Sequence, residues 1–138
     1  MLKNVGIWID HKEAVLVFLK KEQTTLERIP SNAESHFRQS GGWRSGTTPG
    51  VQSIYKEQKA QKRREHQHKK FYHRIIKKIQ KAESVYIFGP GGAKQELTKE
   101  IEKIKGFHPK ISSVQSSKKL TENQLIAKVK SFYDLEKV

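Results

Sequence analysis

Three strand-like runs near the amino end of the chain predict three β-strands. The runs are Val5 to Asp10, Ala14 to Leu19 and Thr24 to Ile29. A short polar connection joins the first two as a hairpin, and Pro30 ends the third. The first two runs are nearly continuous in apolar residues, as expected of strands covered on both faces. We therefore expect an antiparallel meander whose first two strands are central in the sheet.

A long helix is predicted for residues 52 to 82, because this stretch lacks Gly and Pro and is rich in Lys, Gln, Glu and Arg. Its second half carries an apolar stripe, made by Phe71, Tyr72, Ile75, Ile76 and Ile79. Its first half, from Lys56 to Lys70, offers only Ala60. We expect that half to project from the domain or to lie exposed along it.

The rest of the chain alternates strand and helix. The buried strand Ser84 to Phe88 leads through "GPGGAK" into a helix with Leu97, Ile101 and Ile104 on one face. Gly106 is expected to end that helix. A weaker strand, "KISSVQS", follows, and then a capping-box pattern of Thr121 and Gln124 that starts a last helix with Leu125, Ile126, Val129, Phe132 and Tyr133 on one face.

The order of these elements is βββαβαβα, which fits one α/β domain over residues 1–138. Two helical crossovers after the meander imply parallel pairing, and right-handed crossovers leave few arrangements. A ribonuclease H-like mixed five-stranded sheet, in order 3-2-1-4-5 with helices on both faces, fits best.

Composition narrows the class of protein. No apolar run approaches the roughly 20 residues that span a bilayer, and no secretory signal opens the sequence. The chain has no cysteine, which excludes disulfides, thiolate catalysis and cysteine-bound zinc. We expect a soluble, cytoplasmic protein without a membrane partner.

Charge is the strongest signal in the sequence. There are 28 Lys and Arg against 14 Asp and Glu, a net charge of +14. The segment from Lys56 to Lys81 holds eleven basic and two acidic residues and thus nine of those charges. Such an excess indicates a polyanionic partner, and nucleic acid is the first candidate.

Two glycine-rich stretches are candidate binding loops. "RQSGGWRSGTTPG", residues 38 to 50, has no acidic residue and holds Trp43. "GPGGAK" presents backbone N–H groups at a helix start, so Gly91, Gly92 and Lys94 could hold an RNA phosphate or form a plain tight turn. It lacks the P-loop ending, so nucleotide hydrolysis is not expected.

Metal and cofactor chemistry are not expected either. His66 and His68 are two apart on a helix and do not share a face, and His73 lies among cations. Asp10 ends the first strand, where a ribonuclease H begins its carboxylate cluster, but the later strands carry no acidic residue. Nuclease activity is therefore not expected.

The strings "GIWIDHKEAVLVFL" and "VYIFGPGGAKQEL", separated by a Gly-Gly loop and a long basic helix, resemble the middle domain of the eukaryotic and archaeal class-1 release factor and Pelota. They also resemble small stand-alone bacterial members of that superfamily. The resemblance covers roughly Val5 to Ile104 and implies a place in the translational machinery. In the release factors, a Gly-Gly-Gln loop helps water attack the peptidyl-tRNA ester.

In this chain Gly41 and Gly42 match those glycines, but Trp43 replaces the glutamine. An indole donates one N–H and accepts nothing, so it cannot orient a water as an amide does. Trp43 is suited instead to stacking on an unpaired base, which is worth about 1–3 kcal/mol. Hydrolysis is therefore in doubt, and the loop motif that we assign comprises Gly41, Gly42, Trp43 and Arg44.

The first hypothesis is a binding protein that contacts rRNA or tRNA without cofactors. Monomer is favoured, although the residues do not fix the oligomeric state. Its expected RNA contacts are Arg38, Lys56, Lys59, Lys62, Arg63, Arg64, Lys69, Lys70, Arg74 and Lys94. The alternatives are a rescue factor that hydrolyses peptidyl-tRNA with Gln39 or Gln52, and a general nucleic-acid-binding protein.

Overall fold

The strands form one mixed five-stranded sheet. The structure, a computed structural model, describes residues 4–20, 23–32 and 51–136. The strands are β1 (Asn4–Ile9), β2 (Glu13–Leu19), β3 (Thr24–Pro30), β4 (Ser84–Gly89) and β5 (Lys110–Ser116). Their order is β3-β2-β1-β4-β5, with β1 antiparallel to β2 and parallel to β4. The predicted order is confirmed, and both apolar strands lie inside the sheet.

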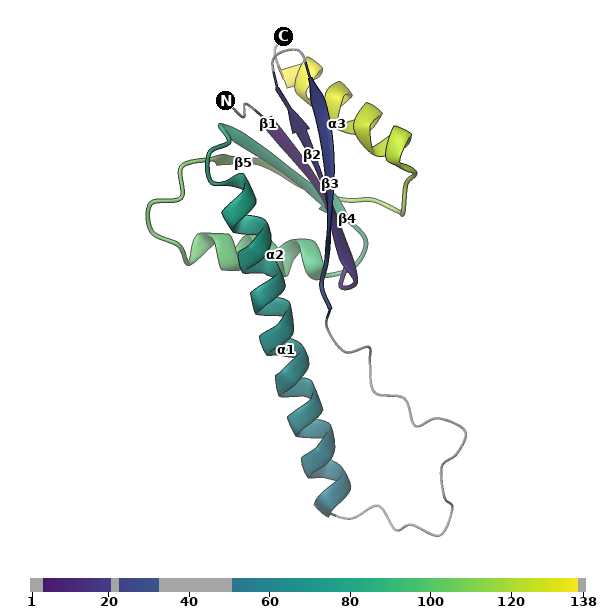
Figure 1. The fold of residues 1–138 in the computed structure, drawn as a ribbon, viewed down its shortest axis with the longest axis vertical. Helices are drawn as coiled ribbons and strands as arrows, with labels where there is room; N and C mark the ends of the chain where they lie inside the picture. Colours follow the sequence, from purple (N-terminus) through teal and green to yellow (C-terminus); the bar gives the residue numbers. More distant parts are fainter. Residues whose placement is uncertain (1–3, 21–22, 33–50, 137–138) are drawn as a thin grey trace.

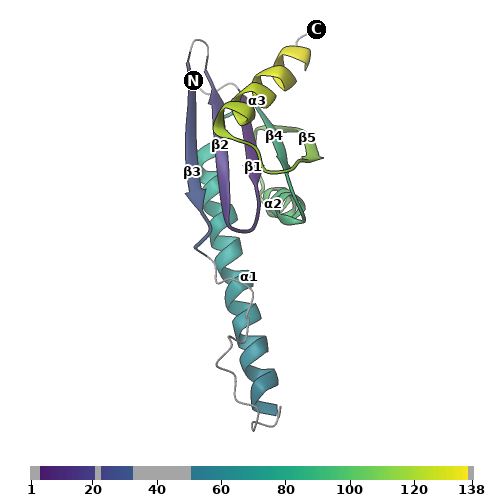
Figure 2. The ribbon, with the colours of Figure 1, turned by 90° about the vertical axis from the view of Figure 1, so that its right-hand side faces the viewer.

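Helices cover both faces of the sheet. They are α1 (Val51–Ile79), α2 (Ala93–Glu102) and α3 (Glu122–Glu136). Figures 1 and 2 show α1 and α2 on one face and α3 on the other. Side chains of β1 alternate accordingly: Val5, Ile7 and Ile9 belong to the cluster with α1 and α2, whereas Trp8 belongs to the cluster with α3. The predicted α/β architecture is confirmed.

Helix α3 starts at the predicted capping box and packs closely on β1. The Thr121 N–H donates to Oε1 of Gln124 at 2.9 Å, and the Gln124 N–H donates to Oγ1 of Thr121 at 3.2 Å. At the contact with β1, a Cβ on Gly6 would lie 2.2 Å from Cγ2 of Val129. Only glycine at position 6 therefore lets the helix approach this far.

Helix α1 has two halves with different surroundings. In the carboxyl half the predicted apolar stripe is buried on the sheet. The amino half extends past the sheet, and Lys56 to Lys59 and Gln61 to Arg63 are exposed, with Ala60 buried between them (Figure 1). This agrees with the expectation for that half. Neither α1 nor another helix within the described residues is long and apolar enough to cross a membrane.

Two helix ends differ from the prediction. Helix α1 ends at Ile79 instead of Ala82, and the Ala82 N–H closes the turn on the Ile79 carbonyl at 3.1 Å. Helix α2 ends at Glu102, before Ile104 and Gly106. Its last turn tightens because the Ile104 N–H donates to Ile101 at 3.0 Å, three residues back. Ile104 still packs against the core from outside the helix.

Candidate nucleic-acid interface

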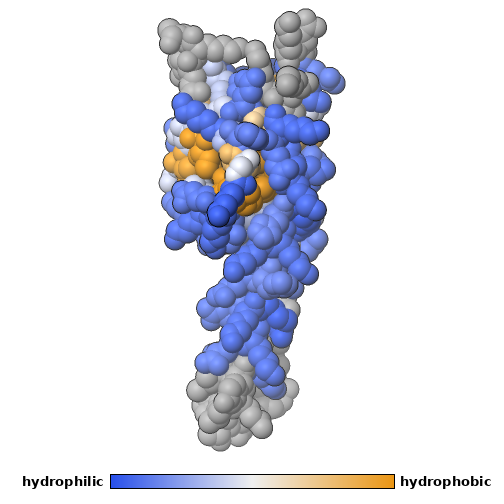
Figure 3. All heavy atoms as spheres, turned by 90° about the vertical axis from the view of Figure 1, so that its left-hand side faces the viewer, coloured by the Kyte–Doolittle hydropathy of each residue, from blue (hydrophilic) through white to orange (hydrophobic). Residues whose placement is uncertain are grey.

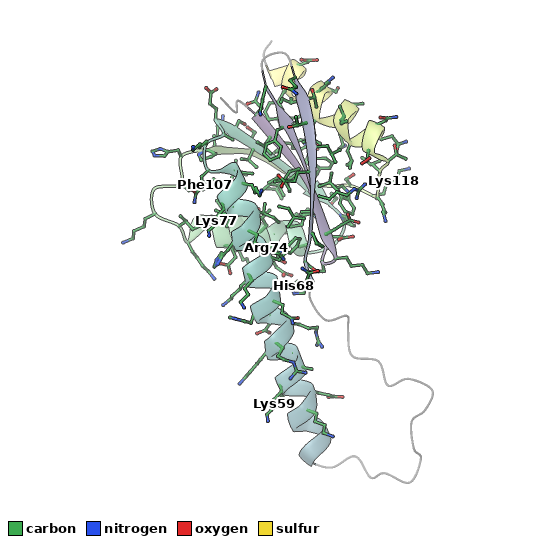
Figure 4. The ribbon with its side chains drawn as sticks, viewed as in Figure 1. Lys59, His68, Arg74, Lys77, Phe107 and Lys118 are labelled. Carbon is green, nitrogen blue, oxygen red and sulfur yellow. The ribbon has the colours of Figure 1, made fainter. Side chains whose placement is uncertain are left out.

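Five exposed cations of α1 lie on the side of the helix that faces away from the sheet. A residue turns the helix by about 100°, so positions spaced by 3, 4, 11 and 18 share one side. We call this set the basic stripe: Lys59, Lys62, Arg63, Lys70 and Lys77. It runs about 27 Å along the axis, long enough to lie beside about eight phosphates of one duplex strand. Figure 4 labels Lys59 in the projecting half and Lys77 over the sheet.

The acidic residues of this part of α1 lie on other sides of the helix. Glu57 and Glu65 are rotated by well over 90° from the middle of the basic stripe. Gln58, Gln61, Lys62 and Glu65 line an open surface depression, and Gln61 donates to Glu65 at 3.5 Å. The helix thus separates a cationic side from a mixed polar side.

Within the described residues, Lys59, Lys62, Lys70 and Lys77 form no ion pair. Nearby cations outside the basic stripe do form such pairs. Nζ of Lys78 lies 2.9 Å from Oε1 of Glu27. The charges of these four lysines are therefore available to a polyanion, whereas Lys78 is already paired with a carboxylate.

Arg74, an expected RNA contact, has a structural partner instead. Its guanidinium donates to the carbonyl of Pro30 at 2.8 Å and to that of Ser31 at 3.2 Å, where β3 ends. It also lies over the Phe71 ring, 5.9 Å from the centroid. Arg74 thus ties α1 to the end of β3. Because its guanidinium is used within the fold, we do not count Arg74 among the RNA contacts.

Two other expected contacts, Lys69 and Arg64, also lie off the basic stripe. Lys69 lines a groove of about 210 Å³ between α1 and α2, among Glu65, His68, Tyr72, Glu96, Lys99, Glu100 and Lys103. Arg64 is half-buried. Lys56, by contrast, is exposed three residues before Lys59 and extends the same side of the helix. The structure therefore divides the predicted cations into one continuous surface and several that lie beside it.

The turn between β4 and α2 does not present a cation to a phosphate. Lys94 is buried, with 4% of its surface exposed, and its ammonium donates to the Gly91 carbonyl. Glu96 lies in the first turn of α2, and its carboxylate stands 3.6 Å from the place a Cβ of Gly92 would take. An incoming phosphate would meet a carboxylate here, so we leave Gly91, Gly92 and Lys94 out of the interface.

A cluster that sequence reasoning missed surrounds Glu96. Its carboxylate accepts from the Tyr72 hydroxyl at 2.7 Å and pairs with Nε2 of His11 at 3.0 Å. The His11 and His68 rings lie 5.0 Å apart, and His68 stacks on Tyr72. The cluster joins the β1–β2 turn to α1 and α2. His11 and Glu96 are 85 positions apart, so no local pattern could have found it.

The surroundings of this cluster shift the pKa values of its members. Burial, followed by the charge of His11, lowers the pKa of His68. Desolvation opposes ionisation of Glu96, but hydrogen bonds from Tyr72 and His11 outweigh it and lower the pKa of that carboxyl. Burial and the bond to Glu96 raise the pKa of the Tyr72 hydroxyl. The folded protein therefore favours neutral His68 and ionised Glu96.

Other candidates from the sequence have local structural roles. Oδ1 of Asp10 accepts from the N–H groups of Lys12 and Glu13, both at 2.8 Å, and so shapes the hairpin turn. Among the residues that the structure describes, no group of three or more His, Cys, Asp or Glu is placed to hold a metal ion. Arg38 and the loop motif Gly41, Gly42, Trp43 and Arg44 lie outside the described residues.

Comparisons with known proteins give a likeness in fold. No protein-family model and no curated protein matches the chain. Among solved structures, an archaeal translation termination factor, aRF1, is 15% identical with a TM-score of 0.45, over 96% of this chain and 39% of that one. Dom34 of S. cerevisiae, a translation termination-like factor involved in RNA quality control pathways and interacting with Hbs1, is 13% identical with a TM-score of 0.38, over 97% and 38%. This chain thus spans about two fifths of either protein.

Proposed function

We propose that this protein binds RNA through the basic stripe of α1 and acts in translation with the ribosome as its partner. The observation that carries the proposal is the basic stripe itself, in which lysines that form no ion pair with the described part of the chain line one side of α1. Each lysine placed on a phosphate releases a counterion, and that release drives association without reading sequence. The translational setting rests on the motif resemblance described above.

The Gly-Gly-Trp segment, residues 41 to 43, is included in this proposal because of its place in the sequence. That segment precedes Val51, the end of α1 that lies farthest from the sheet (Figure 1). A partner that engages the amino half of α1 would therefore lie at the helix end to which this segment is joined in sequence. We assign Trp43 a stacking role on an unpaired base and assign the loop no hydrolytic role, because the glutamine is missing.

Sedimentation with purified ribosomes over a sucrose gradient tests the proposal. We expect co-migration at low salt, its loss at high salt, and its loss at low salt in a variant carrying Lys59→Glu, Lys62→Glu and Lys70→Glu. The matched control carries Lys20→Glu, Lys119→Glu and Lys130→Glu, which make the same change in net charge at exposed sites elsewhere. The control is expected to bind almost normally.

Equal loss in both variants would reduce the interaction to net charge and overturn the role of the basic stripe. Free sedimentation of the unmodified protein at low salt would overturn the ribosomal proposal altogether. Release of peptide from stalled ribosomes, abolished by Gly41→Ala, would favour the hydrolytic alternative instead. Binding to duplex DNA as tight as binding to ribosomes would favour a general nucleic-acid-binding protein.

A further inference from the structure

Strand β5 is an open edge of the sheet. Within the described residues it pairs with β4 alone, whereas β3 is the edge on the opposite side. The Lys110 and Ser117 N–H groups donate toward β4, to Glu83 and Gly89, both at 3.0 Å. Because backbone groups alternate in direction along a strand, those of Val114 and Ser116 point away from β4. These two residues therefore present two N–H and two C=O groups to the open edge.

The two edges differ in their protection. β3 carries Glu27 and Arg28 and ends at Pro30, and such charged and proline residues deter pairing with another strand. From Ile111 to Ser116, β5 has no charged residue and no proline. An irregularity opposite Val85 and Tyr86 interrupts its ladder, but pairing is regular from Ser113 onward. The last part of β5 thus lacks the charged and proline residues that deter pairing with another strand.

An apolar strip borders this edge on the face covered by α1 and α2. It consists of Ile104, Phe107, Ile111 and Val114, and Val114 is 36% exposed. The irregularity keeps Ile111 and Val114 on one face, since they pair with Val85 and Ile87 of the same core cluster. Figure 3 shows hydrophobic surface gathered on this side of the molecule, and Figure 4 labels Phe107 there.

Charge indicates what kind of strand would fit beside β5. From Lys103 to Lys119 the chain has five lysines, one histidine and no acidic residue. A second copy of this chain would bring the same cations to the same edge, with a net charge of +14 on each molecule. An acidic strand would instead be attracted to the edge.

We propose that β5 accepts an extended acidic segment of a partner protein as a sixth strand. The segment bonds to the outward groups of Val114 and Ser116, and its apolar side chains, two residues apart, cover the strip of Ile104, Phe107, Ile111 and Val114. Its acidic residues, on the alternate positions, face the α3 side of the sheet, the side of Lys110 and Lys118. This surface is separate from the basic stripe and is occupied independently of RNA.

Titration with a capped peptide that alternates valine and glutamate over about six residues, an ordinary strand length, tests the inference. We expect it to bind, and to slow amide hydrogen exchange of Val114 and Ser116. The same peptide with lysine in place of glutamate is expected not to bind. Failure of the glutamate peptide to bind, or equal binding of both peptides, would overturn the proposal.

Two variants test separately how the outward backbone N–H and the apolar strip contribute to peptide binding. Ser116→Pro removes one outward N–H, leaves the charge unchanged and is tolerated at an edge, so binding should weaken about five- to tenfold. Val114→Asp removes an apolar contact and repels the peptide, so it should weaken binding at least as much. Asn123→Asp, exposed on α3 across the sheet, repeats the charge change and should have little effect. Unchanged binding in Ser116→Pro and Val114→Asp would place the peptide elsewhere.

Discussion

The basic stripe predicts how RNA affinity should depend on salt. With five phosphate contacts to a single strand, log K should fall with log salt at a slope of about −3.5, since each contact contributes about −0.7. Raising salt from about 50 to 200 mM would then weaken binding about 130-fold. Any contacts made by residues 38 to 50 would add to this slope.

Neutralising three lysines of the basic stripe tests the predicted slope of log K against log salt. In a variant with Lys59→Gln, Lys62→Gln and Lys70→Gln, the slope should become shallower by about 2.1, whatever the other contacts contribute. With only two contacts left, the same rise in salt would weaken binding about sevenfold. Glutamine is used because it removes the contacts without adding repulsion.

Fluorescence anisotropy of a labelled single-stranded RNA, measured at a series of salt concentrations, gives both slopes. Lys20→Gln, Lys119→Gln and Lys130→Gln form the control, with the same net charge and no change on α1. The control should keep the slope of the unmodified protein. If both variants flatten the slope equally, binding follows overall charge and the geometric reasoning about α1 is refuted.

Three further predictions concern the fold that holds α1. Gly6→Ala should destabilise the protein by about 1–3 kcal/mol through overpacking, and should cost less in a Val129→Ala background, measured by a double-mutant cycle in urea; simple additivity would contradict the contact. Thr121→Ala should cost about 1 kcal/mol through loss of the cap, whereas Thr121→Ser should be nearly neutral in the same assay. The lowered pKa values of His68 and Glu96 mean that the unfolded chain takes up protons before the folded one does, so stability is full above the ordinary values of 6.5 and 4.5 and is lost as pH falls below each. Calorimetry should therefore show a falling Tm on acidification, and His68→Gln should remove the part of that fall that begins near pH 6.5, leaving the part near 4.5; an unchanged profile in His68→Gln would refute this assignment.

The fold was predictable because its determinants are local. Continuous apolar runs indicated β1 and β2, and the Thr121 and Gln124 spacing indicated the start of α3. Crossover handedness then left few sheet orders. Helix ends were predicted less well, because the end of α2 depends on how its last turn tightens and not on Gly106.

The candidate site was predictable only in part. Residue types identified the basic helix, and the rotation of 100° per residue would have separated the basic stripe from its neighbours. The roles of Arg74 and Lys94 could not be read from the sequence, because each depends on a carbonyl that the tertiary fold brings to it. Only a cation that is not already bonded to backbone carbonyls of the fold, as Arg74 and Lys94 are, is available to bind RNA.

Binding of a polyanion should stabilise the helical conformation of the amino half of α1. Most side chains of this amino half are exposed, so its helix, about four turns long, gains little from packing and is marginal in water. Like charges along one side destabilise it further. Phosphates lying along that side would cancel the repulsion between the cations and so favour the α-helical conformation. The amino half of α1 should therefore exchange its amide hydrogens faster than the half on the sheet, and a bound polyanion should slow that exchange.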